Sequence, residues 1–158
     1  MTIQVGDSIP ALTLKTPSVD GPKEIALNDV FKGKKVVLFA VPGAFTPGCS
    51  NTHMPGFIIH ADSIKDKGVD TIACVAVNDA FVMGAWADSQ NAEEILMLAD
   101  GSCQLTEALG LVLDATAAGL GKRSRRYAMI VEDGVVTSLN IDEKGIEQSS
   151  AENILRQL

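Results

Sequence analysis

The segment from residue 36 to residue 49 constrains the fold more than any other part of the chain. It opens with an apolar run, Val36–Val41, that is typical of a buried strand, and the run stops at Pro42-Gly43. A longer segment of helical character begins near Cys49. The sequence therefore predicts a strand, a tight loop and a helix, with Cys49 in the first turn of that helix.

The predicted position of Cys49 favours a reactive thiolate. A sulfur in a first helical turn lies near free backbone N–H groups and the positive end of the helix dipole, and both stabilise an anion. Such surroundings lower a cysteine pKa from about 8.5 to roughly 3.5–7.5. Thr46 lies three residues upstream, where its hydroxyl can turn toward the sulfur or a bound substrate. The alternative is that Cys49 is a small buried hydrophobic residue, the usual fate of a free cysteine.

Composition excludes several classes of function. The chain has 158 residues, 46% of them hydrophobic, which is enough for the core of one domain over residues 1–158. A net charge of −7 and only 4% aromatic residues argue against binding to nucleic acids or anionic membranes. There is no long apolar span and no secretory signal pattern, so we expect a cytoplasmic protein that begins at Met1.

The three cysteines, Cys49, Cys74 and Cys103, are too few and too widely spaced for a disulfide scaffold. No CxxC pair is present, so a thioredoxin-type dithiol site is missing. Cys49 and His53 are four residues apart, as metal ligands on one helix face sometimes are. His60 is the only other histidine and no second close pair follows, so we expect no structural zinc site.

Alternating strand and helix patterns predict an α/β fold with a mixed sheet. Besides Val36–Val41, strands are predicted at Ile9–Leu14, Val69–Val77, Ile95–Leu98, Arg126–Val131 and Val135–Ile141, and helices at Cys49–Lys67 (kinked or starting late at Pro55), Phe81–Ala87, Leu105–Leu109 and Asn153–Leu158. Asn78-Asp79 suits a helix cap, and Asp133-Gly134 a hairpin turn. Ser149 and Glu152 form a Ser-x-x-Glu capping box ahead of the last helix.

The spacing Pro42-x-x-x-Thr46-x-x-Cys49 matches the peroxiredoxin signature. The longer string Pro-Gly-Ala-Phe-Thr-Pro-Gly-Cys-Ser-x-x-His-x-Pro-Gly-Phe resembles the type II, or peroxiredoxin-5-like, branch. The other matching segments are Val77–Trp86, Ala99–Gly101, Gly119–Tyr127 and Ser149–Leu155. The resemblance extends from near residue 3 to the C-terminus.

The resemblance implies a thioredoxin-like fold and an antioxidant peroxidase that needs no metal, haem or flavin. It places the peroxidatic nucleophile at Cys49, which would attack a hydroperoxide and become a sulfenic acid. Thr46 would hydrogen-bond the peroxide and the sulfur, and Pro42 would shield the sulfur from water. Arg126 would support the thiolate and polarise the peroxide, since an arginine stays charged and offers a rigid fork of donors.

Arg126 also has a simpler interpretation from the sequence. Together with Lys122, Arg123 and Arg125 it forms a basic cluster, and such runs are usually a solvated face or a nucleic-acid patch. Arg126 differs from the others because it opens an apolar strand, where alternation can point its side chain inward.

The resemblance also bears on how the sulfenic acid is reduced. Plant and some bacterial type II peroxiredoxins carry a resolving cysteine just before the Val-Asn-Asp motif, at the position of Cys74. The alternative is inert packing, the default for a cysteine within an apolar strand. The loop Glu147–Ser150, where other members carry their resolving cysteine, has none. We expect Cys103 to be an exposed surplus thiol in a loop.

The expected partners are a hydroperoxide, a reductant (glutaredoxin with glutathione, or thioredoxin) and a second copy of the chain. Type II peroxiredoxins commonly dimerise around the active site, and Phe45, Phe81 and Trp86 are candidate interface or core residues. The alternative function is a redox sensor or relay, which uses the same kind of thiol but turns over little peroxide alone. The sequence leaves open the preferred peroxide, the reductant and the sensitivity to overoxidation.

Overall fold

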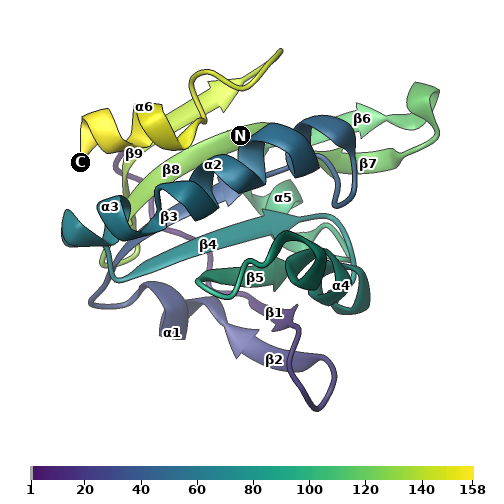
Figure 1. Ribbon diagram of the computed structural model, residues 1–158, viewed down its shortest axis with the longest axis horizontal. Helices are drawn as coiled ribbons and strands as arrows, with labels where there is room; N and C mark the ends of the chain where they lie inside the picture. The colour runs from purple at the N-terminus through teal and green to yellow at the C-terminus, as the bar shows by residue number, and fades with distance from the viewer. Residues whose placement is uncertain (1) are drawn as a thin grey trace.

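A mixed seven-stranded sheet forms the centre of the part of the chain that the computed structural model describes, residues 2–158 (Figure 1). Its strands, in spatial order, are β2 (Lys23–Ala26), β1 (Thr13–Thr16), β5 (Ile95–Ala99), β4 (Thr71–Ala76), β3 (Lys35–Ala40), β8 (Arg126–Glu132) and β9 (Val135–Asp142). Strands β3, β4 and β5 are parallel, and β8 runs antiparallel to β3. The expected α/β fold with a mixed sheet is confirmed.

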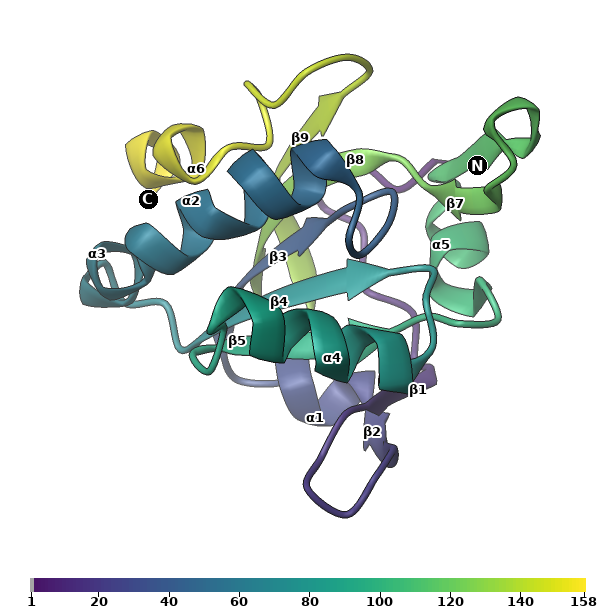
Figure 2. The ribbon, with the colours of Figure 1, turned by 45° about the vertical axis from the view of Figure 1, so that its right-hand side comes forward.

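Helices cover both faces of the sheet (Figures 1 and 2). One face carries the π-helix η1 (Cys49–His53), α2 (Met54–Ile59), α3 (Ala61–Asp66), α4 (Ala80–Gln90) and α6 (Ala151–Gln157). The other carries α1 (Leu27–Phe31) and α5 (Gln104–Leu109). A small hairpin of β6 (Val112–Ala115), the 3₁₀ turn η2 (Thr116–Ala118) and β7 (Gly121–Ser124) lies outside the main sheet.

The two central parallel strands place two loops at the same edge of the sheet. Strands β3 and β4 are almost wholly buried because helices cover both of their faces, which explains their continuous apolar sequences. The loops that follow them are joined by a hydrogen bond of 3.0 Å from the backbone N–H of Ala44 to Oδ1 of Asn78. This edge carries the Pro-x-x-x-Thr-x-x-Cys segment.

Most of the predicted local signals are confirmed. Helix α4 begins where Asp79 accepts a hydrogen bond of 2.8 Å from the N–H of Val82. The β8–β9 turn has positive φ at both Asp133 (49°) and Gly134 (79°), as a tight two-residue hairpin requires. The helix expected from residue 49 to 67 is divided, and its regular α-helical part starts late, with Pro55 in the first turn of α2.

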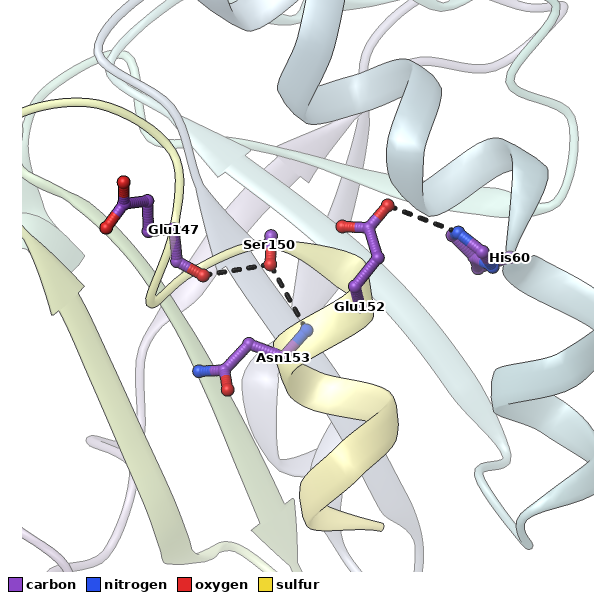
Figure 3. Close-up of polar contacts among 5 residues, drawn as sticks. All are labelled: His60, Glu147, Ser150, Glu152 and Asn153. Carbon is purple, nitrogen blue, oxygen red and sulfur yellow. Dashed lines mark hydrogen bonds and ion pairs between the residues drawn. The ribbon is translucent and has the colours of Figure 1, made fainter.

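The first predicted strand and the last predicted cap are wrong. The strand spans Thr13–Thr16 rather than Ile9–Leu14. Pro10 has no N–H to contribute to a ladder, so the chain before residue 13 stays irregular. The cap of α6 is Ser150, whose hydroxyl accepts from the N–H of Asn153 at 3.1 Å and donates to the carbonyl of Glu147 (Figure 3).

Glu152, expected as the return partner of a capping box, instead joins α6 to the end of α2. Its carboxylate lies 3.2 Å from Nε2 of His60 (Figure 3). Hydrogen bonding and the nearby His60 hold the pKa of Glu152 below its usual value. This pair fixes the C-terminal helix beside the helices that follow Cys49.

Two further findings concern membrane-spanning helices and metal sites within residues 2–158. None of the helices in this range is long and apolar enough to cross a membrane. The same residues contain no group of three or more His, Cys, Asp or Glu side chains arranged to hold a metal ion.

Candidate active site

The sulfur of Cys49 lies at the start of a helix, as expected, but in a π-helical turn. The N–H of Met54 bonds to the carbonyl of Cys49, five residues back, and the N–H of Ser50 bonds to the carbonyl of Thr46 at 2.9 Å. Single π-turns are rare and occur often at functional sites. The Cys49 side chain is fully buried, so a substrate must enter between the residues around it.

Arg126, the first residue of β8, provides the cation beside this sulfur. Its Nη2 lies 3.2 Å from Sγ of Cys49, which confirms that strand alternation points it inward. A guanidinium in this place can stabilise both a thiolate and the negative charge that develops on a departing oxygen.

The other terminal nitrogen of Arg126 contacts His53, which follows Cys49 by one helical turn. Nη1 lies 2.8 Å from Nδ1 of His53, and Nε2 of His53 lies 2.9 Å from the backbone carbonyl of Ser149. The ring packs against Phe39 and Phe57, with centroid separations of 5.1 and 5.6 Å. His53 is therefore a buried histidine with both ring nitrogens in use.

Asp142 holds the loop that supplies this carbonyl. Its carboxylate accepts from the N–H groups of Glu147, Gln148 and Ser149, and from the hydroxyl of Ser149 at 2.7 Å. Burial alone would raise the pKa of Asp142, but these hydrogen bonds outweigh it and hold the pKa below its usual value. Asp142 pairs directly with Arg126 across the β8–β9 ladder, so the loop returns to the site.

Thr46 and Pro42 lie in the segment between β3 and η1, and Thr46 differs from expectation. The hydroxyl of Thr46 donates to the carbonyl of Gly43 at 2.7 Å and not to the sulfur. Its oxygen lone pairs are left to accept a hydrogen bond from a substrate. Pro42 is half-buried and, with Leu113 and Arg126, lines a cavity of about 430 Å³. This cavity admits a small molecule to the edge of the site.

The remaining basic residues near Arg126 have partners of their own. Lys122 pairs with Glu107 at 3.1 Å, and Arg125 pairs with Glu143 at 3.4 Å. Arg123 donates to the carbonyl of Leu120 at 3.0 Å. The run of basic residues is thus divided among separate contacts, and only Arg126 reaches the sulfur.

Comparison with known proteins decides the family. The Redoxin family matches residues 4–155. The chain is 50% identical to Peroxiredoxin-2E-2 of the rice chloroplast, over 99% of this chain and 73% of the rice protein. It is 48% identical to the chloroplast Peroxiredoxin-2E of Arabidopsis thaliana, over 99% of this chain and 70% of that protein. The chain belongs to the peroxiredoxin family.

Solved structures agree with this membership. Reduced Prx3 from Vibrio vulnificus, in complex with hydrogen peroxide, has 55% sequence identity and a TM-score of 0.95, with 99% of each chain covered. Peroxiredoxin 5 from Alvinella pompejana has 39% identity and a TM-score of 0.86, with 98% of this chain and 96% of that chain covered. The fold is therefore the thioredoxin-like fold of type II peroxiredoxins, and the protein is a thiol-dependent peroxidase.

The second cysteine of this peroxiredoxin, Cys74, lies fully buried in the middle of β4. It pairs with Phe39 in the β3–β4 ladder and belongs to the same buried cluster as Cys49, so both face the helical layer of α2 and α4. Burial, and then the nearby Cys49, raises the pKa of Cys74 well above its usual value. In this state Cys74 is a neutral thiol.

The expectation of an exposed Cys103 is wrong. This residue precedes α5 in a left-handed conformation (φ 61°) and is only 6% exposed. Burial, followed by the carboxylates of Asp100 and Glu107, raises its pKa. Packing under the start of α5, which sequence patterns did not reveal, makes it a poor candidate for oxidation.

His53 is the functional neighbour whose role the sequence left open. The motif shows that it follows Cys49 by four residues, but its partners are 73 and 96 residues away in the chain. Its spacing from Cys49 suggested only a shared helix face, as metal ligands sometimes have.

Acid should destabilise the folded protein through His53. Burial, with a contribution from Arg126, lowers the pKa of His53 from 6.5 to about 4. Between pH 6.5 and about 4, His53 is therefore protonated in the unfolded chain but neutral in the folded chain. The stability that is present above pH 6.5 is lost as the pH falls toward 4. The expected loss is about 3 kcal/mol of unfolding free energy.

Denaturant titrations at several pH values between 7 and 4 would measure this loss. The control is His53→Asn, which lacks the titrating imidazole but keeps all the carboxylates. If the two proteins lose equal free energy over this range, His53 is not held neutral by burial.

Proposed function

We propose that Cys49 is the peroxidatic nucleophile of this peroxidase. The thiolate sulfur attacks the terminal oxygen of a hydroperoxide, so an S–O bond forms as the O–O bond breaks. The sulfur is oxidised by two electrons to a sulfenic acid, and the departing alkoxide or hydroxide takes up a proton. The observation that carries the proposal is the 3.2 Å contact between Nη2 of Arg126 and Sγ of Cys49.

Three other residues, Arg126, Thr46 and Pro42, assist the reaction of Cys49 in this proposal. Arg126 holds the thiolate and stabilises charge on the breaking O–O bond, since fixed donors aimed at developing charge lower a barrier strongly. Thr46 accepts a hydrogen bond from the O–H of the bound peroxide, because its own hydrogen is already donated to the carbonyl of Gly43. Pro42 limits the access of water to the sulfur from the cavity side.

Hydrogen peroxide and small alkyl hydroperoxides are the proposed substrates. The sulfur is fully buried, and the adjoining cavity of about 430 Å³ is lined in part by Pro42 and Leu113. A small peroxide fits such an opening without rearrangement of the sheet. The likeness to Prx3 of Vibrio vulnificus, whose reduced form was solved with hydrogen peroxide, supports the same substrate.

Cys74 is the proposed resolving thiol, and it can act only after local unfolding. Its thiol is neutral and fully buried, whereas disulfide formation needs an attacking thiolate with access to the sulfenic acid. The turn around Cys49 must therefore move. Trp86 donates from Nε1 to Oγ of Ser50 at 2.9 Å, so this movement would break a contact of the only tryptophan.

The test is the intact mass and cysteine mapping of the reduced protein after one equivalent of hydrogen peroxide, with tryptophan fluorescence followed in parallel. Gain of one oxygen on Cys49 supports a one-cysteine enzyme, and loss of two hydrogens with a Cys49–Cys74 link supports the resolving role. Rapid oxidation at any other residue, or none, contradicts the proposal for Cys49. Many turnovers with dithiothreitol would separate an enzyme from a redox relay.

We propose that glutaredoxin with glutathione, or thioredoxin, reduces the oxidised enzyme in the cytoplasm. The protein has three free cysteines and no disulfide within residues 2–158, as is usual in a reducing compartment. Turnover in the presence of each reductant system, at equal thiol concentration, distinguishes the two.

The proposed assembly is a homodimer formed through the loops that follow β3 and β4. Phe45, in the loop after β3, and Phe81, in the first turn of α4, are 54% and 73% exposed, large values for phenylalanine. The hydrogen bond between Ala44 and Asn78 joins the loop of Phe45 to the loop that leads into α4. Exposed aromatic side chains grouped on one edge are typical of an interaction surface. Trp86 is fully buried and belongs to the core.

Replacing Phe81 by glutamate should weaken this dimer at least about tenfold, because a charge would replace an aromatic anchor. Sedimentation equilibrium over a range of concentrations measures the dissociation constant. The control is Ile59→Glu, at the exposed end of α2, which is 76% exposed in the wild type. A monomeric wild-type protein, or equal effects of the two variants, would contradict this interface.

A further inference from the structure

The buried imidazole of His53 is fixed in one tautomer by its two partners. The backbone carbonyl of Ser149 can only accept a hydrogen bond, so Nε2 of His53 must carry the proton at their 2.9 Å contact. The guanidinium of Arg126 can only donate, so the unprotonated Nδ1 accepts from Nη1 at 2.8 Å. The neutral ring satisfies both contacts at once.

This arrangement fixes the direction of the whole guanidinium. The group is planar and rigid, so when Nη1 is held by His53 the position of Nη2 is also set. That second nitrogen is the one that contacts Sγ of Cys49 at 3.2 Å. An arginine side chain otherwise has many rotamers, and the acceptor on His53 selects one of them.

We propose that His53 is a positioning residue of the peroxidase site, a neutral hydrogen-bond acceptor that aims Arg126 at the sulfur of Cys49. Phe39 and Phe57 hold the ring in place on one side, and the Ser149 carbonyl holds it on the other. The proposal rests on Cys49 as the reacting thiol.

The surroundings keep His53 in the required state. Burial lowers its pKa to about 4, which outweighs the opposing effect of the Ser149 carbonyl. At neutral pH the ring therefore carries no charge that would repel Arg126, and Nδ1 remains an acceptor. Protonation would place a second donor opposite the guanidinium and break the contact.

The β9–α6 loop takes part in this arrangement from outside the motif. Asp142 fixes Ser149 through two hydrogen bonds, of 2.8 Å from its N–H and 2.7 Å from its hydroxyl. The carbonyl that orients His53 is thus itself held in place. A segment near the C-terminus thereby sets the geometry of a thiol in the first third of the chain.

Three substitutions at position 53 separate the two contacts. In His53→Asn the amide oxygen can take the place of Nδ1, so Arg126 keeps its acceptor while Ser149 loses its donor. In His53→Gln the terminal amide nitrogen can take the place of Nε2, so Ser149 keeps its donor and Arg126 loses its acceptor. His53→Leu removes both contacts and retains bulk.

The readouts are the second-order rate constant with hydrogen peroxide and the pH profile of Cys49 alkylation by iodoacetamide. His53→Leu and His53→Gln should each lower the rate constant about tenfold, the scale of one hydrogen bond to a charged group, and shift the alkylation profile to higher pH. His53→Asn should keep both quantities within about twofold of wild type. Circular dichroism and thermal unfolding check that each variant is folded.

A double substitution tests whether His53 acts through Arg126. In the Arg126→Ala background, His53→Leu should cause no further loss of rate, because there is no guanidinium left to aim. The proposal is overturned if the losses multiply, if His53→Leu keeps the wild-type rate, or if His53→Asn is as slow as His53→Leu. These outcomes can be distinguished from a wrong assignment of Cys49. If Cys49 were not the nucleophile, Cys49→Ser would retain peroxide turnover.

Discussion

Cys49→Ser is expected to lower peroxide turnover by at least about three orders of magnitude, to the background of the assay. A serine hydroxyl does not ionise near neutral pH and cannot form a sulfenic acid, so position 49 can no longer take up the peroxide oxygen. Hydrogen peroxide consumption with dithiothreitol as reductant measures the loss. Circular dichroism should show that the fold is retained, since the substitution exchanges one atom of a buried side chain.

The matched control is Cys103→Ser. Cys103 is also buried, and its raised pKa keeps the thiol neutral, but it lies before α5, which covers the opposite face of the sheet from α2. This variant should retain wild-type turnover. Activity that survives in Cys49→Ser, or an equal loss in Cys103→Ser, would refute the assignment of the nucleophile.

Arg126→Ala should reduce the second-order rate constant for hydrogen peroxide by about 10²–10³. The guanidinium contacts the sulfur directly, at 3.2 Å. Its removal therefore destabilises the thiolate and also leaves the charge that develops on the leaving oxygen without this cation. Stopped-flow measurement of peroxide reduction gives the rate constant. The pH profile of Cys49 alkylation should move to higher pH in the same variant.

Two further variants make the result specific to Arg126. Arg126→Lys keeps the charge but lacks the planar fork, so it should restore only part of the rate. Lys122→Ala removes a cation that pairs with Glu107 on the surface, and it should leave the rate unchanged. A wild-type rate in Arg126→Ala would show that the guanidinium takes no part in the reaction.

Sequence-based predictions were accurate where a structural feature depends on residues close together in the chain. The buried strands, the Asp79 cap and the Asp133-Gly134 hairpin depend on neighbouring residues, and all were predicted. Short elements such as β2 and β6, four residues each, carry too few positions for a periodic pattern and were missed.

The errors also have identifiable causes. Ser149 satisfied the local rule for a helix cap, but its N–H and hydroxyl are bound by Asp142, and Ser150 caps the helix instead. Cys103 was placed in a loop correctly, but its burial depends on packing that no local pattern records. In both cases a tertiary contact determined the outcome.

The sequence by itself determined the segment that carries the proposed nucleophile. Pro42, Thr46 and Cys49 lie within eight residues between a strand and a helix, so their spacing is readable as one motif. The apolar runs likewise determined an α/β fold, because burial of a parallel strand requires apolar residues on both faces.

Only the tertiary structure decided what surrounds the sulfur. Arg126 and His53 are 73 residues apart, and His53 and Ser149 are 96 apart. The order of the strands brings β8 beside β3, and the Asp142 carboxylate folds the following loop back to His53. Hydrogen bonds of this kind depend on angstrom-scale positions set by the packing of the whole sheet, and spacing along the chain does not encode those positions.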